Sequence, residues 1–172
     1  MRQESLPVSL AKDSVRYFME HGELMPIPSG TLPPELSKRA GVFVSLKKHG
    51  QLRGCIGTIL PTQGSAAGEV IRNAVSAATE DPRFNSVTPA ELDELEVSVD
   101  ILGTPKRISS VSELDPKKYG VIVQWGSRSG VLLPDLEGIN SAEEQVSIAC
   151  RKAGIGSEES VELYRFQVTR YR

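Results

Sequence analysis

Residues 52–58, with the sequence LRGCIGT, hold the side chains best suited to chemistry. If this stretch is a strand, a period of two projects Arg53, Cys55 and Gly57 from one face. A fixed positive charge beside a thiol favours the thiolate, which is the nucleophilic form of cysteine. Glycines inside a strand mark the close approach of a ligand or another backbone, so we expect Gly54 and Gly57 to border a bound substrate. The stretch predicts a nucleophilic Cys55 and an Arg53 that orients an anion.

A structural interpretation of the same residues stays open. Free cysteines are commonly small buried hydrophobic residues, and Cys55 is equally suited to fill a gap in a sheet. A general base for the thiol is hard to find, because His49 lies in an expected turn roughly 15–20 Å of strand away. Arg53 is also suited to pair with a carboxylate such as Asp81.

A second group of charged residues follows an expected helix, in the sequence Asp81-Pro82-Arg83-Phe84. Asp81 and Arg83 are expected to converge on the cleft at Cys55, Asp81 as a catalytic carboxylate and Arg83 as a substrate-binding cation. The alternative is a helix stop with a surface ion pair, worth at most about 1 kcal/mol.

Two further residues have weaker claims to a role. Trp125, in an expected hairpin turn, is a candidate substrate platform, with ordinary packing under a loop as the alternative. Cys150 falls on the apolar side of an expected helix and is predicted to belong to the core.

Composition excludes several classes of function. The formal net charge of −2 disfavours nucleic acid as a partner. Two histidines and two cysteines without ligand spacing predict no metal site. No glycine-rich phosphate or dinucleotide fingerprint occurs, so no cofactor is predicted. The chain shows neither a secretory apolar region nor a membrane-length apolar run, and we expect a cytoplasmic protein with free thiols.

The apolar patterns predict an α+β fold with a largely antiparallel central sheet flanked by helices. A length of 172 residues fits one domain. In chain order we expect a helix over 10–19, an irregular connector over 26–34, a hairpin over 41–59, a helix over 65–80, a helical turn over 88–92, a strand over 95–102, a connector over 103–115, a hairpin over 119–133, a helix over 141–153 and a strand over 162–169.

Four short motifs in order make the chain similar to the AMMECR domain family, whose microbial members are often called AmmeMemoRadiSam system protein A. LRGCIGT resembles the family signature, and the similarity extends from about Leu10 to near Tyr171. The other motifs are DPRF at 81–84, GVLLP at 130–134 and CRKAG at 150–154. The resemblance implies one domain over 1–172, with a central sheet divided into a larger and a smaller lobe. It also implies a pathway shared with Memo-like and radical-SAM proteins as partners.

Two functional hypotheses follow. The first is an enzyme, or an enzyme-associated subunit, that acts on a small or modified substrate in a cleft at Cys55. The alternative is a non-catalytic protein-binding or adaptor module that uses the same surface. A regulator linked to nucleic acid is disfavoured by the charge.

Overall fold

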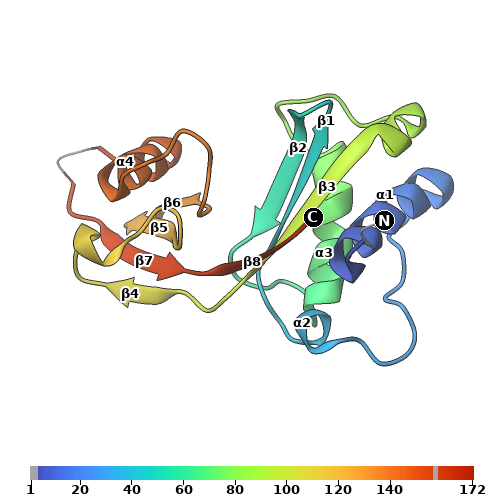
Figure 1. Cartoon of the computed structure of the whole chain (residues 1–172), viewed down its shortest axis with the longest axis horizontal. Helices are drawn as coiled ribbons and strands as arrows, with labels where there is room; N and C mark the ends of the chain where they lie inside the picture. The colour runs from blue at the N-terminus through green and yellow to red at the C-terminus, as the bar shows by residue number, and fades with distance from the viewer. Residues whose placement is uncertain (1–3, 157–158) are drawn as a thin grey trace. The chain divides into compact units, whose positions relative to one another are not determined.

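The computed structural model describes residues 4–156 and 159–172 (Figure 1). The chain divides into two compact units, a larger one of Met1–Leu102 with Thr169–Arg172 and a smaller one of Gly103–Val168. Each unit contains β-strands, α-helix and 3₁₀ helix, and antiparallel strand pairs occur in both units. The α+β class expected from the sequence is confirmed, with the strands divided between two four-stranded sheets.

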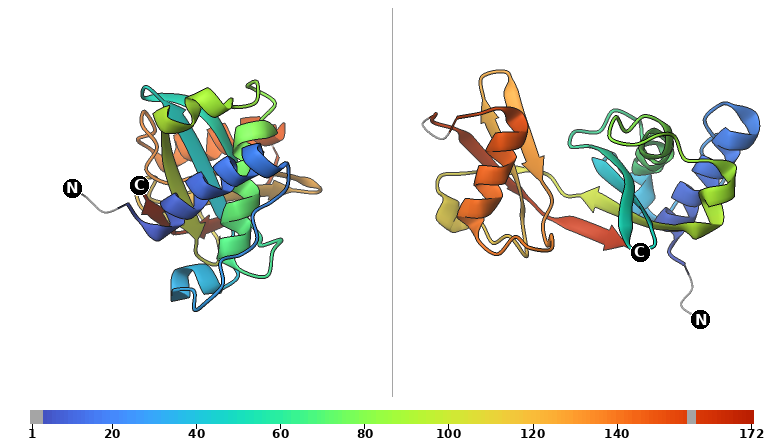
Figure 2. Two further views of the ribbon diagram at one scale, coloured as in Figure 1. Left: turned by 90° about the vertical axis from the view of Figure 1, so that its right-hand side faces the viewer. Right: turned by 90° about the horizontal axis from the view of Figure 1, so that it is seen from above.

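The larger unit contains a sheet with the strand order β2-β1-β3-β8. Its helices α1 and α3 lie on one face of that sheet in the views of Figure 2. The elements are α1 (Leu6–His21), α2 (Pro34–Ser37), β1 (Val42–Lys48), β2 (Gln51–Thr58), α3 (Ala66–Thr79), the 3₁₀ helix η1 (Pro89–Glu94), β3 (Leu95–Leu102) and β8 (Val168–Tyr171).

Local sequence explains the ends of these elements. The β1–β2 turn is formed by His49 and Gly50, whose φ angles of 50° and 75° match a tight hairpin turn. Helix α3 begins after Ser65, whose hydroxyl accepts the Gly68 N–H at 3.2 Å. Helix α1 begins at Leu6, earlier than the predicted start near residue 10, because Pro7 suits a first helical turn.

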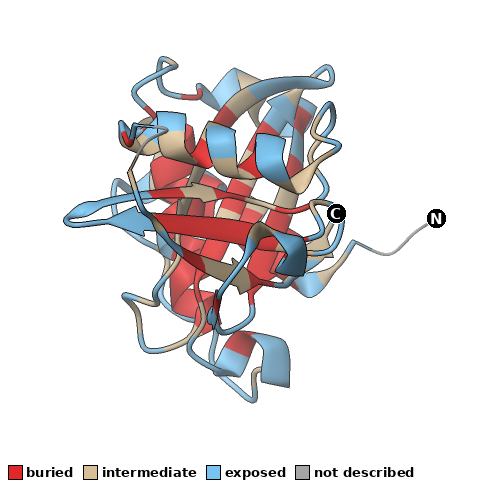
Figure 3. Cartoon of the chain, turned by 90° about the vertical axis from the view of Figure 1, so that its left-hand side faces the viewer, coloured by how far each residue is buried: buried red, intermediate tan, exposed pale blue. Residues whose placement is uncertain are grey.

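The core of the larger unit lies between the sheet and its helices. Val42, Val44 and Leu46 of β1 are wholly buried there, and alternate residues of β1 face the opposite side. Figure 3 shows that buried positions concentrate on the strands, whereas the loops are largely exposed. Strand β3 has the predicted bounds, with Val97 and Val99 among the buried residues.

The smaller unit contains the sheet β4-β7-β5-β6 and the helix α4. Its elements are β4 (Lys106–Ile108), the 3₁₀ helix η2 (Val111–Glu113), β5 (Gly120–Trp125), β6 (Arg128–Leu132), α4 (Ala142–Ala153) and β7 (Glu162–Phe166). Helix α4 is capped by the Ser141 hydroxyl and ends at Gly154, as its sequence predicts.

Two predictions in this region were wrong. The connector expected over 103–115 contains β4 and η2, which are too short to show a periodic pattern. The single strand expected over 162–169 is two strands, β7 and β8, which belong to different sheets. The apolar alternation runs through both strands, so only the pairing partners reveal the break near Gln167, whose carbonyl accepts the Gly103 N–H at 2.8 Å.

Candidate functional site

The site expected at LRGCIGT lies on β2, the end strand of its sheet. The register with β1 shifts inside this strand: Leu46 pairs with Gly54, but Lys47 pairs with Leu52. Arg53 is therefore the extra residue of a β-bulge. The strict alternation that would place Arg53 beside Cys55 does not hold at this point.

The carboxylate partner of Arg53 is Glu91, and the pairing with Asp81 considered from the sequence was wrong. Arg53 Nε donates to Glu91 Oε1 at 3.0 Å, and Nη2 donates to Oε2 at 3.1 Å. Arg53 Nη1 also donates to the carbonyl of Asn85 at 2.8 Å. The Arg53 guanidinium and the Thr88 N–H lower the pKa of Glu91 to about 2. Arg53 thus fastens β2 to the segment that follows α3.

Asp81 and Arg83 bind each other and the outer edge of β2. Asp81 Oδ2 accepts the Cys55 N–H at 2.9 Å, while Arg83 Nη2 donates to the Cys55 carbonyl at 3.5 Å. Between themselves they form a bidentate pair, Nε to Oδ1 at 3.0 Å and Nη2 to Oδ2 at 2.8 Å. Asp81 is only 5% exposed, and the Arg83 guanidinium holds the pKa of its carboxyl far below the usual range. This pair satisfies backbone groups that a further strand would otherwise bind.

The Cys55 side chain belongs to a line of polar groups that crosses the sheet. Its Sγ lies 3.2 Å from Ser45 Oγ. In the register of the sheet Ser45 pairs with both Cys55 and Ser98, so these three side chains share one face. We call Cys55, Ser45 and Ser98 the polar row.

The neighbouring residues on this face include a buried ion pair. Phe43 pairs with Gly57 on one side and with Asp100 on the other. Asp100, 5% exposed, accepts bonds from Arg170 Nε at 2.7 Å and Nη2 at 2.8 Å. The charges of this pair are mutually compensated, so the polar row offers mainly neutral hydrogen-bonding groups.

The electrostatics of Cys55 differ from those expected. Burial raises the pKa of its thiol, and this effect outweighs the lowering by the Ser45 hydrogen bond and the charge of Arg83. The cation that acts on the thiol is Arg83, and no effect of Arg53 on it is resolved. The net effect on the thiol pKa is thus a rise where the sequence led us to expect a fall, and the nucleophilic role of Cys55 stays a prediction.

The two glycines of the motif make close approaches within the chain itself. A Cβ at Gly54 would lie 2.1 Å from the carbonyl oxygen of Ala77 in α3. A Cβ at Gly57 would lie 2.2 Å from the ring of Phe43. The predicted close approach is present, but protein atoms fill the space in which we expected a substrate.

The remaining predicted residues lie elsewhere. His49 lies in the hairpin turn, where its Nε2 is 2.8 Å from Glu94 Oε2. Trp125 belongs to the smaller unit, where it is 39% exposed with the Arg128 guanidinium 5.6 Å from its ring centre. Cys150 is partly buried beside the core of that unit, and burial raises the pKa of its thiol.

Sequence reasoning missed three residues that matter at this site: Glu91, Ser45 and Arg170. Glu96, Ser98 and Asp100 alternate with apolar residues in the sequence of β3, which is a usable signal for one polar face. Only the strand register, however, connects that face with Cys55. The partner of Arg53 had no local signal, because Glu91 is separated from it by an entire helix.

The described ranges hold neither a cluster of metal-binding side chains nor a helix of membrane-spanning character. Residues 4–156 and 159–172 contain no cluster of three or more histidine, cysteine, aspartate or glutamate side chains arranged to hold a metal ion. In the same ranges no helix is both long and apolar enough to cross a membrane.

Comparison with known proteins extends over nearly the whole chain. The model of the AMMECR1 family matches residues 8–171. A protein of Thermotoga maritima is 52% identical over 161 residues, 92% of each chain. Protein CA_C1420 of Clostridium acetobutylicum is 47% identical over 99% of this chain, which spans 37% of that protein. The crystal structure of uncharacterised protein PH0010 from Pyrococcus horikoshii aligns with a TM-score of 0.88 and 32% identity, covering 95% of this chain and 88% of its own.

Proposed function

We propose that this chain, which belongs to the AMMECR1 family, is a non-catalytic binding module for a partner protein. In this proposal the recognition surface is the sheet face that carries the polar row. Cys55 acts there as a neutral hydrogen-bonding and packing group.

The observation that carries the proposal is the state of the Cys55 thiol. Its pKa is raised by burial, and its hydrogen bond joins it to the Ser45 hydroxyl. A nucleophilic cysteine needs thiolate character. The groups expected to supply that character have other partners, because Arg53 binds Glu91 and Asp81 binds the Cys55 N–H and Arg83.

The chemistry of the face suits recognition. Hydroxyl and thiol groups both donate and accept hydrogen bonds, and they lose little on desolvation when a partner replaces water. The buried Asp100–Arg170 pair holds β8 beside β3 and keeps this face ordered. A preformed surface reduces the entropy that is lost when a partner binds.

The expected partners are the Memo-like and radical-SAM proteins that the family resemblance implies. The cytoplasmic location expected from the sequence is part of the same proposal and is supported by the two free cysteines. The enzyme hypothesis is the alternative, and it requires that Cys55 react.

A pair of variants separates recognition from catalysis. Wild type, Cys55→Ser and Ser45→Lys are each titrated against purified Memo-like and radical-SAM proteins by biolayer interferometry. Cys55→Ser keeps a small hydrogen-bonding group, so we expect partner affinity and pathway output within about twofold of wild type. Ser45→Lys places a charge in the middle of the polar row, and we expect affinity to fall by more than about tenfold, since a charge buried without a partner is costly.

The matched control is Ser129→Lys, which adds the same charge at an exposed position of β6 in the smaller unit. It should bind like wild type. If Cys55→Ser binds partners normally but abolishes pathway output, the enzyme hypothesis replaces the proposal. If wild type binds neither protein, the proposed partners are wrong.

A further inference from the structure

Within residues 4–156 and 159–172, one end of strand β3 has no strand beside it at the edge of the sheet, and this edge shares only Ser98 with the polar row. Strand β3 has eight residues, whereas its neighbour β8 has four. Part of β3 therefore extends beyond β8. A groove of about 350 Å³ lies along this part, with residues 95–98 among those that line it, and it includes neither Cys55 nor Asp81.

The backbone groups that face this groove follow from the hydrogen-bond pattern of the sheet. The Cys55 N–H points outward to Asp81, so Cys55 and Ser45 form a non-hydrogen-bonded pair. Ser45 must then exchange its backbone bonds with Ser98, its partner on β3. Because these directions alternate along a strand, Val97 aims its N–H and C=O away from β1, into the groove.

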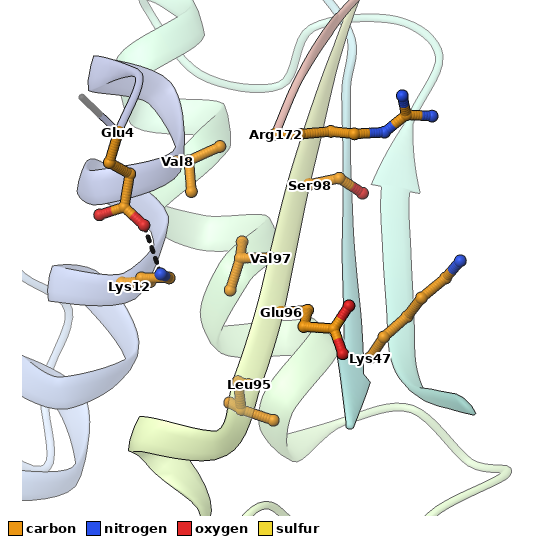
Figure 4. A pocket seen from close by; sticks show the side chains of 9 residues that line it. All are labelled: Glu4, Val8, Lys12, Lys47, Leu95, Glu96, Val97, Ser98 and Arg172. Carbon is orange, nitrogen blue, oxygen red and sulfur yellow. Dashed lines mark hydrogen bonds and ion pairs between the residues drawn. The ribbon is translucent and has the colours of Figure 1, made fainter. Parts of the chain in front are cut away.

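The walls of the groove differ in character. Toward α1 the groove is lined by the apolar Val8 and Val97, which are 2% and 8% exposed, and by the Glu4–Lys12 ion pair. Figure 4 shows that Lys47, Glu96, Ser98 and Arg172 extend on the other side of β3. A strand added here would alternate side chains between an apolar wall and a charged one.

The charged wall carries one more positive than negative side chain, because Lys47 and Arg172 stand against Glu96 alone. Lys47 and Arg172 have no hydrogen-bond or ion-pair partner among residues 4–156 and 159–172. Glu96 accepts the Gly50 N–H at 3.2 Å, and the Glu4–Lys12 ion pair at the α1 side is already neutral. The groove therefore favours an occupant with carboxylates facing Lys47 and Arg172.

We propose that this groove binds an extended acidic segment of a partner protein, which adds to β3 as a strand. Backbone bonds to Val97 fix the register of the segment. Small apolar side chains of the segment pack toward Val8, and alternate acidic side chains face Arg172 and Lys47. The inference does not rest on the proposed role of Cys55 and survives if that role is wrong.

The probe is a fluorescein-labelled hexapeptide of alternating valine and glutamate, titrated with the full chain and followed by fluorescence anisotropy. Three comparisons test the mode of binding. A peptide with lysine in place of glutamate should bind at least about tenfold more weakly, because the wall charges then repel it. A peptide N-methylated at alternate amides should also bind at least about tenfold more weakly, because strand addition needs those N–H donors. In NMR spectra the Val97 amide should shift on binding.

The variant test uses the exposed end of the groove. Arg172→Glu reverses a charge at an exposed position, and we expect it to weaken binding of the valine–glutamate peptide about five- to tenfold. The control Lys106→Glu makes the same charge change at an exposed residue of β4 in the smaller unit and should leave binding unchanged.

Several results would overturn the proposal. These are no binding of the valine–glutamate peptide at millimolar concentration, equal binding of the N-methylated peptide, and equal effects of the two variants. Sedimentation that shows a dimer disrupted by Arg172→Glu would mean that a second copy of the chain occupies the edge, which also contradicts the proposed occupant.

Discussion

Asp81→Asn tests whether the Asp81–Arg83 pair stabilises the outer edge of β2. The substitution keeps the size of the side chain and removes its charge. In the wild-type protein one carboxylate accepts the Cys55 N–H at 2.9 Å and two bonds from the Arg83 side chain. An amide has only one oxygen to accept these bonds, so at least one donor loses its partner.

The expected loss in the free energy of unfolding is about 1.5–3 kcal/mol, the usual range for a hydrogen bond to a charged group. It comes mainly from the Cys55 N–H bond to a carboxylate that is 5% exposed. The Arg83 side chain is 56% exposed, so water largely replaces its lost ion pair. Urea unfolding followed by circular dichroism measures the total. Hydrogen exchange at the Cys55 amide measures the local effect, with faster exchange expected in the variant.

Asp93→Asn is the matched control in the same unit. Its carboxylate is 92% exposed and lies 3.3 Å from Arg16, so its removal should change stability by less than about 0.5 kcal/mol. Equal stability of Asp81→Asn and Asp93→Asn would refute the edge role of Asp81. Unchanged exchange at Cys55 would refute it as well.

Further predictions concern the bulge, acid stability and the packed glycine. Arg53→Lys cannot reproduce the bidentate bond to Glu91 and should lower the free energy of unfolding in urea by about 1–2 kcal/mol. The control Arg72→Lys changes an exposed arginine and should leave stability unchanged. Equal stability of the two variants would contradict the anchoring role of Arg53. Because the folded pKa of Glu91, about 2, lies below its unfolded value near ~4.3, its stabilisation is complete above that value and lost as pH falls toward 2. In an acid titration, the free energy of unfolding of Glu91→Gln should therefore fall less steeply between these two pH values than that of wild type. An unchanged slope would contradict the proposed contribution of Glu91 to acid stability. Gly54→Ala forces a Cβ to 2.1 Å from a helix carbonyl and should cost about 1–3 kcal/mol of stability, whereas Gly64→Ala, in open space, should be tolerated.

Local patterns in the sequence were sufficient for most elements of the fold. The turn at His49 and Gly50, the cap at Ser65 and the alternation of β3 each depend on a few adjacent residues. Chain order alone also gave the antiparallel character of the hairpins, since a two-residue turn permits no other pairing.

Features that depend on distant partners were not accessible in this way. A bulge at Arg53 changes the register by one residue, yet its strand looks regular in the sequence. The partner of Arg53 is Glu91, 38 residues away, and no periodicity connects the two. Likewise, the thiol pKa depends on burial, which a strand pattern does not reveal for a residue on the less buried face.

The most direct test of the central claim is the rate of alkylation of Cys55 by iodoacetamide in the folded protein as a function of pH. Cys150 is the internal control, because burial raises the pKa of both thiols. We expect Cys55 to react slowly at neutral pH, with an apparent pKa above the ~8.5 of a free thiol. Rapid reaction at neutral pH, with an apparent pKa well below that value, would show an activated thiolate and contradict the binding module in favour of an enzyme.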